Sequence, residues 1–378
     1  MPHEPVPDRR RFLESVSTFG CAVALRGVVP GDVSAHATVP RTAAGQGVRG
    51  RRPVQKMVIA TEYTVEQEVS VPVVQTAYRG YIEEISQGEI EVELHPGGEL
   101  GVGGVLVEKL LSGEVHAIQV SLANMAAFVP AIDLVNIPYW CGDNQRFANL
   151  ITSQAWADEI APQLAARDLK VLFYYTEDPR TIATRRGVGD PVRTPEDARG
   201  LRIRVPGSRV LAEFCRLVGA EPVPIPWGRT LEALRGGEAD ALDPAGTTLY
   251  TAGFRDVLGS ISLISSVPDA NVYVCNLRWF ESLTPEARAA LEEASDKAMV
   301  ASFAALPGCR AYSADQLQGQ GVEIYQPTED EIATWVEAAG EHRPEWDGFK
   351  TELAGSLDAF ARLKLAASTK GKYTVDDF

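Results

Sequence analysis

The stretch "RTPEDARGLRIRVPGSRVL", residues 193–211, contains a helix, a strand and a second helix in close succession. Thr194 is a suitable N-cap and Pro195 suits the first position of a helix, so a short helix is predicted there. Residues 201–205 alternate as a strand does, and residues 208–218 have helical spacing. Because strands and helices alternate in this way along most of the chain, the sequence predicts an α/β fold.

The same patterns predict elements elsewhere in the chain. Strands are expected at residues 54–61, 90–95, 117–120, 170–175 and 221–225, and helices at residues 76–86, 104–111, 144–166 and 230–235. A further helix begins after Thr284 and is expected to end at Pro307 and Gly308, because proline and glycine interrupt helices. The length of 378 residues suggests two domains.

The composition excludes two classes of protein. The chain carries a net charge of -15 and has no basic stripe interleaved with aromatic residues, so nucleic acid is not an expected partner. The longest uncharged run, residues 115–132, contains several polar residues and lacks the apolarity of a membrane span. We therefore expect no transmembrane helix in the mature protein.

The N-terminus has the features of an export signal. Residues 9–13, RRRFL, resemble the twin-arginine motif, an apolar segment follows at residues 16–29, and the A-H-A of residues 35–37 suits a signal peptidase. We predict that residues 1–37 are a twin-arginine signal peptide and that the protein is periplasmic. A basic disordered tail and a lipoprotein anchored through Cys21 are the weaker alternatives.

Cysteine spacing and known motifs give no sign of catalysis. Cleavage would leave Cys141, Cys215, Cys275 and Cys309, which contain no C-x-x-C and are expected to be separate buried thiols. The sequence also lacks an H-E-x-x-H, a G-x-S-x-G and a G-x-x-x-x-G-K-[ST]. We therefore predict neither an enzyme nor a metal or cofactor site.

Two arginines occupy the strand of the opening stretch. Side chains alternate along a strand, so Arg202 and Arg204 share one face, while the apolar residues of 201–205 share the other. That polar face must meet either water or an anion. Patterning alone leaves both possibilities open.

Residues 200–206, GLRIRVP, resemble a signature segment of the solute-binding proteins of TRAP transporters, the DctP family. Further segments resemble the family in the same order: 95–101 (HPGGELG), 110–115 (LLSGEV), 119–121 (QVS), 128–140 (FVPAIDLVNIPYW), 219–224 (GAEPVP) and 234–241 (LRGGEADA). The resemblance extends over residues 57–310. It implies a two-lobed fold with a mixed sheet in each lobe, hinge strands, and a long helix that links the lobes.

The resemblance also implies an organisation and a function. The ranges are linker 38–56, lobe I 57–177 and 270–309, lobe II 178–269 and 310–365, and a C-terminal tail 366–378. The expected protein is a monomeric receptor that closes on an organic acid and delivers it to a TRAP membrane permease. Two alternative functions stay open. An enzyme on the same two-lobed frame would need a nucleophile and a base, and a sensor on that frame would lack a permease partner.

The resemblance implies the following ligand-binding residues: Arg204, Arg180, Trp227, Asn124, Ser121, Glu62, Thr61 and Asp243. Arg204 corresponds to the arginine that clamps the ligand carboxylate, for which a planar guanidinium fork is well suited. Arg180 corresponds to a second ligand arginine, and Trp227 to an aromatic wall. Arg202 is expected to face solvent or to form a structural ion pair.

Overall fold

The computed structural model describes residues 54–375 of the chain. The predicted signal peptide 1–37 and most of the predicted linker lie outside the described residues. Strand β1 begins at Gln55, so the last two positions of the predicted linker, 55 and 56, belong to a sheet. Within residues 54–375, no helix is long and apolar enough to cross a membrane.

The first sheet has five strands in the order β2-β1-β3-β10-β4. Their bounds are β1 Gln55–Ala60, β2 Ile90–His95, β3 Ala117–Ser121, β4 Leu169–Pro179 and β10 Pro268–Asn276. Strand β1 is parallel to β2 and β3, whereas β10 is antiparallel to β3 and β4. The sheet is therefore mixed, and the carboxyl ends of β1 and β3 meet at one edge.

The second sheet has six strands in the order β11-β9-β5-β8-β6-β7. Their bounds are β5 Ile182–Arg185, β6 Arg202–Val205, β7 Glu221–Pro224, β8 Ala241–Leu242, β9 Leu258–Ser262 and β11 Glu323–Tyr325. Strands β7, β6 and β8 are parallel, and β5 is antiparallel to β8 and β9. This sheet is also mixed, which confirms the predicted two-lobed α/β fold.

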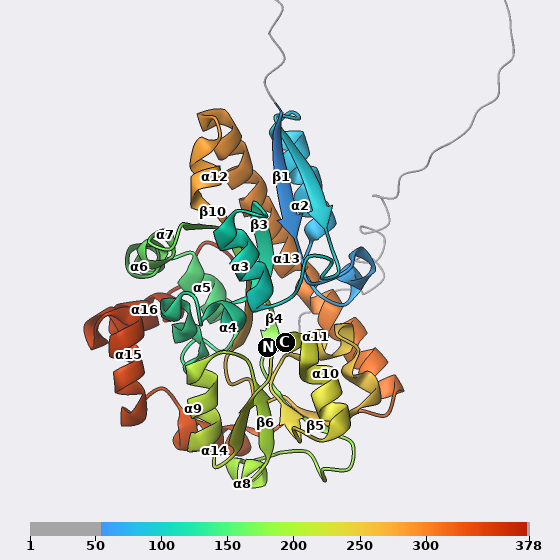
Figure 1. The fold of residues 1–378 in the computed structure, drawn as a ribbon. Coiled ribbons are helices and arrows are strands. Elements are labelled where there is room, and N and C mark those ends of the chain that lie inside the picture. Colours follow the sequence, from blue (N-terminus) through green and yellow to red (C-terminus); the bar gives the residue numbers. More distant parts are fainter. Residues whose placement is uncertain (1–53, 376–378) are drawn as a thin grey trace, which may run out of the picture. The chain divides into compact units, whose positions relative to one another are not determined.

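Helices cover both sheets (Figure 1). The α-helices are α2 Gln75–Ile85, α3 Gly104–Ser112, α4 Leu122–Met125, α5 Asn144–Ile151, α6 Gln154–Glu159, α7 Ala161–Ala165, α8 Pro195–Ala198, α9 Arg209–Leu217, α10 Trp227–Gly236, α11 Gly246–Thr251, α12 Leu277–Ser282, α13 Pro285–Gly319, α14 Glu329–Ala339, α15 Asp347–Ala354 and α16 Leu357–Ser368. The 3-10 helices are η1 Val65–Val69, η2 Pro130–Asn136, η3 Phe254–Asp256 and η4 Pro344–Trp346.

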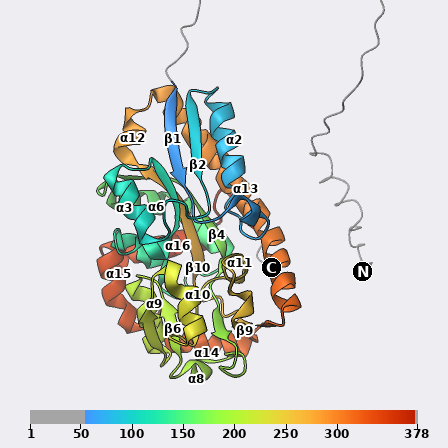
Figure 2. The ribbon, with the colours of Figure 1, turned by 45° about the vertical axis from the view of Figure 1, so that its right-hand side comes forward.

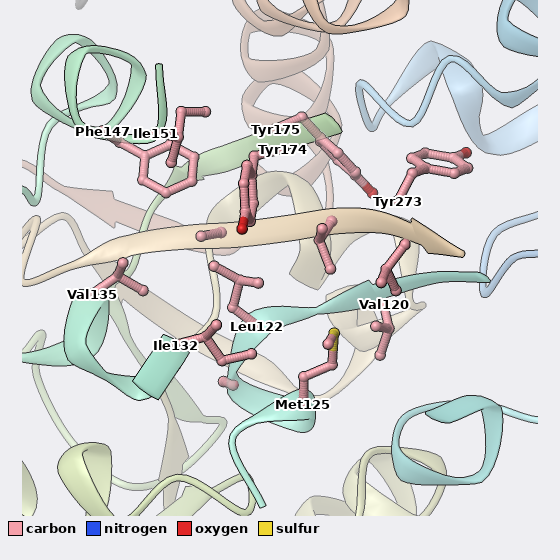
Figure 3. Packing of buried hydrophobic residues seen from close by; sticks show 14 of the residues in the cluster. Val120, Leu122, Met125, Ile132, Val135, Phe147, Ile151, Tyr174, Tyr175 and Tyr273 are labelled. Atoms are coloured by element: carbon pink, nitrogen blue, oxygen red, sulfur yellow. The ribbon is translucent and has the colours of Figure 1, made fainter. Parts of the chain in front are cut away.

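The core of the first lobe forms around β10, whose nine residues are all buried. Figure 3 shows Phe147 of α5 near Tyr174 on one side of this strand, and Leu122 and Met125 of α4 on the other. The ring of Tyr273 stacks on that of Phe173 in β4, with 4.6 Å between centroids. This packing fixes β4 and β10, the two strands that lead to the second lobe.

Three connections join the two sheets. Strand β4 continues through residues 180–181 into β5, and β9 continues through residues 263–267 into β10. The third connection is α13, which runs beside strands of both sheets (Figures 1 and 2). The prediction that this helix ends at Pro307 and Gly308 is wrong, because α13 continues to Gly319 with Pro307 inside it. Packing against α11 and β11 carries the helix past the proline.

Other predicted elements differ from the structure in detail. The single helix expected over residues 144–166 is three short helices, because Ser153 caps α6 and Pro162 lies in the first turn of α7. The four cysteines at positions 141, 215, 275 and 309 are free and buried, as predicted.

The C-terminal segment packs on elements of the first lobe. Helices α15 and α16 contact η2 and α5, although residues 310–365 were predicted to belong to lobe II. The amides of Gly371 and Val375, in the predicted tail, donate to the side-chain oxygens of Asn149 and Gln145. The exact lobe boundaries stay a prediction.

Candidate ligand-binding site

A narrow pocket lies between the two sheets. Its lining residues are Glu62, Tyr63, Ser121, Asn124, Glu177, Arg180, Arg204, Pro206, Trp227, Pro244, Thr248, Asp269 and Asn271. They follow the carboxyl ends of β1 and β3 in one sheet and of β6, β7 and β8 in the other, or lie on the connecting strands. Ligands of α/β sheets bind at such strand ends.

Strand β6 directs its two arginines to different partners. Arg202 forms a bidentate pair with Asp240, with Nε to Oδ2 at 2.9 Å and Nη2 to Oδ1 at 2.8 Å. The predicted structural ion pair is therefore confirmed. Arg204 is only 2% exposed and lines the pocket. It forms no ion pair with the carboxylates of residues 54–375.

Backbone and aromatic contacts hold Arg204 in place. Its Nε donates to the carbonyl oxygen of Ile225 at 2.9 Å, and its guanidinium carbon lies 5.3 Å from the centroid of the Trp227 ring. The Nη2 atom is buried and has no hydrogen-bond partner among the described residues. Burial lowers the pKa of Arg204 to about 10, because no carboxylate contacts the charge directly. An unpaired buried cation of this kind is suited to bind an anion.

Arg180 lies in the connection between β4 and β5, and two carboxylates neutralise its charge. Its Nη1 contacts Asp243 at 3.1 Å, and its Nη2 contacts Asp269 at 2.6 Å. Burial opposes the charge of Arg180, but these two carboxylates outweigh burial and raise its pKa. Arg180 and Asp243 thus form a structural ion cluster, and their predicted ligand contacts stay a prediction.

Two glutamates of the pocket lack a cationic partner among the described residues. Glu62 accepts a hydrogen bond from the amide of Gly103 at the start of α3. Glu177 is completely buried and accepts hydrogen bonds from the hydroxyls of Tyr63, Tyr175 and Thr248. Burial raises the pKa of Glu62 to about 7 and that of Glu177 to about 8.

The other predicted residues divide into two groups. Ser121 and Asn124 line the pocket from the turn after β3, where the Ser121 hydroxyl accepts a hydrogen bond from the backbone N–H of Asn124. Trp227 lines it from the start of α10. Thr61 does not line the pocket, because its buried hydroxyl donates to Gln75 and to the Tyr63 carbonyl. The contact roles of all these residues stay predictions.

Sequence reasoning missed five polar or aromatic residues of the pocket: Tyr63, Glu177, Thr248, Asp269 and Asn271. Most of these residues lie near the connections between the two sheets, and only the tertiary fold brings them together. One signal was present, since Asp269 and Asn271 are two positions apart in an otherwise apolar segment and therefore share a strand face.

Comparisons with known proteins agree with this architecture. The chain is 25% identical to the 2,3-diketo-L-gulonate-binding periplasmic protein YiaO of Escherichia coli (strain K12) over 236 residues, 62% of this chain and 71% of the relative. It is 23% identical to the ectoine-binding periplasmic protein TeaA of Halomonas elongata over 250 residues, 66% of this chain and 72% of the relative.

A solved structure matches over the whole fold. The sugar acid binding protein DctPAm of Advenella mimigardefordensis, in complex with galactonate, has a TM-score of 0.75 at 18% identity, covering 84% of this chain and 99% of that chain. The family model of the bacterial extracellular solute-binding proteins, family 7, matches residues 76–348, most of the chain. The family predicted from the sequence is therefore confirmed: the chain belongs to the DctP family of bacterial extracellular solute-binding proteins.

Proposed function

We propose that this protein is the extracytoplasmic receptor of a TRAP-type transporter, which binds a small carboxylate between its lobes and delivers it to a membrane permease. The observation that carries the proposal is the buried guanidinium of Arg204, which lines the pocket without a carboxylate partner in residues 54–375. Relatives named for binding 2,3-diketo-L-gulonate, ectoine and galactonate support a small ligand.

The energetics require that the lobes close around the ligand. A hydrogen bond to a charged group contributes about 1.5–3 kcal/mol, whereas micromolar binding needs about 8 kcal/mol. Arg204 alone is therefore insufficient. Closure adds contacts from both lobes, such as Asn124 and Trp227, and removes water from the ion pair.

A thermal-shift screen of the mature chain against organic acids tests the receptor function. A ligand at 100 times its Kd adds about 2.7 kcal/mol to the free energy of unfolding, which gives a clear rise in Tm. If no carboxylate in a broad library raises the Tm, the proposed function is wrong. Nuclear magnetic resonance of the bound acid after long incubation separates receptor from enzyme, because a receptor returns the ligand unchanged.

The export route and the permease partner need separate tests. Replacing both Arg9 and Arg10 by lysine is expected to keep the precursor in the cytoplasm, as for a twin-arginine substrate. Undiminished export would contradict that route. Uptake of the ligand into vesicles that contain the permease is expected to require the receptor, and light scattering is expected to give the mass of a monomer.

A further inference from the structure

The pocket is lined by more carboxyl groups than arginines. Its arginines are Arg180 and Arg204, whereas its carboxylates are Glu62, Glu177 and Asp269, with Asp243 bound behind Arg180. The ion pairs with Asp243 and Asp269 neutralise Arg180. Arg204 is then the one arginine of the described lining without an ion pair, and its charge attracts Glu62 without forming one. Glu62 and Glu177 also line the pocket without an ion-pair partner among the described residues.

An anionic ligand would leave these glutamates uncompensated. A carboxylate bound by Arg204 neutralises that arginine but adds nothing to balance Glu62 and Glu177. A second carboxylate on the ligand would be repelled by both, and like charges in a buried site cost several kcal/mol. A dicarboxylate would therefore be disfavoured wherever either glutamate is ionised, or would hold both in their protonated forms.

Hydroxyl groups on a ligand would not supply what Glu177 lacks. Its carboxylate already accepts hydrogen bonds from three protein hydroxyls, those of Tyr63, Tyr175 and Thr248. Its hydrogen-bonding capacity is largely used, and no cation of the described residues forms an ion pair with it, so a cationic group of the ligand would favour its ionised form. One carboxylate oxygen of Glu62 accepts a hydrogen bond from the backbone amide of Gly103, and its side chain lines the same pocket.

We propose, on the basis of the receptor function above, that the ligand is a compact zwitterion whose carboxylate binds Arg204 and whose cationic nitrogen binds beside Glu62 and Glu177. Such a ligand brings one charge of each sign to groups of the opposite sign. Tyr63 and Trp227 also line the pocket, and aromatic rings attract cationic nitrogen.

The proposal predicts a direction for proton exchange. The two glutamates act on each other, and the other titratable groups that interact with one or both of them are Tyr63, Tyr175, Arg180, Arg204, Asp269 and Cys309. A cationic nitrogen favours the ionised glutamates, so binding of a zwitterion releases protons and tightens as pH rises through about 7–8. A purely anionic ligand would take up protons and bind more weakly over the same range.

A thermal-shift library sorted by charge provides the test. It contains zwitterions such as ectoine, L-proline and glycine betaine, monoanions such as galactonate and glucuronate, and dianions such as succinate. The largest rise in Tm is expected from a zwitterion. If only anions raise the Tm, the inference is wrong but the receptor function stands. If no carboxylate of any class raises it, both fail.

Calorimetry on Glu62→Gln then tests the mechanism with the best zwitterion of the library. The substitution keeps the shape of the side chain and removes its charge, so affinity is expected to fall at least about tenfold and proton release to shrink. Galactonate is expected to bind this variant no more weakly than the original protein. Arg202→Met is the matched control, because Arg202 pairs with Asp240 outside the pocket. Unchanged zwitterion affinity in Glu62→Gln would overturn the inference.

Discussion

Replacing Arg204 by methionine is expected to weaken ligand binding while it stabilises the ligand-free protein. Methionine has a similar length and fits the apolar part of the site, but it cannot pair with a carboxylate. The loss of a desolvated charge pair costs about 2–5 kcal/mol of binding, or about 30-fold to a few thousand-fold in Kd. A structural role alone would lower stability and affinity together.

The stability change follows from the burial of the arginine. Its pKa is lowered by burial to about 10, and each pKa unit corresponds to about 1.4 kcal/mol, so the unpaired charge costs the ligand-free fold roughly 3 kcal/mol. The variant also loses the hydrogen bond to the Ile225 carbonyl, which is worth about 1 kcal/mol. The free energy of unfolding is therefore expected to rise by about 1–2 kcal/mol.

Urea unfolding of the ligand-free protein and calorimetry with its ligand measure the two effects separately. Arg202→Met is the control from the same strand, and it should keep the affinity but lose some stability, because it leaves Asp240 without its bidentate partner. The reasoning is refuted if Arg204→Met keeps its Kd within about threefold, which is about 0.7 kcal/mol. A large loss of stability in Arg204→Met would refute the burial argument.

Three further predictions concern the groups around the pocket. Arg180→Met strands the buried Asp243 and Asp269, so urea unfolding should show a loss of about 3–5 kcal/mol, and a loss below about 1 kcal/mol would contradict the ion cluster. Because burial raises the pKa of Glu177 to about 8, the ligand-free fold binds more protons than the unfolded chain from about pH 4.5 to 8. Its stability should therefore fall as pH rises through this window, and Glu177→Gln should flatten that slope; an equal slope in the variant would contradict the assignment. The four free cysteines should make the Tm independent of dithiothreitol and should react with a thiol reagent only on unfolding; a Tm lowered by the reductant would indicate a disulfide.

Local sequence signals predicted much of the fold because they depend on neighbouring residues. The strand at residues 90–95 was predicted at its observed bounds, and the helix at residues 208–218 differs by one residue at each end. Pro307 misled the prediction for α13, since tertiary packing there outweighs the helix-breaking tendency of proline. The segment 258–276, which forms β9 and β10, received no assignment from patterning, because nearly all of its strand residues are buried and the alternation of a half-exposed strand is lost.

The site was predictable where a motif marked it and unpredictable where the fold creates it. The alternation in β6 placed Arg202 and Arg204 together, and only the family resemblance separated their roles. No local signal shows that Asp269 reaches Arg180 across 89 positions of sequence, so the neutralisation of Arg180 could not be foreseen. The charge balance of the pocket, on which ligand choice depends, is a property of the tertiary structure.

A crystal structure of the protein with its ligand tests the central claim most directly. We expect the ligand carboxylate within about 3.2 Å of the terminal nitrogens of Arg204, with the pairs of Arg180 to Asp243 and Asp269 intact. A carboxylate bound by Arg180 instead, with Arg204 paired to a protein carboxylate, would contradict the account.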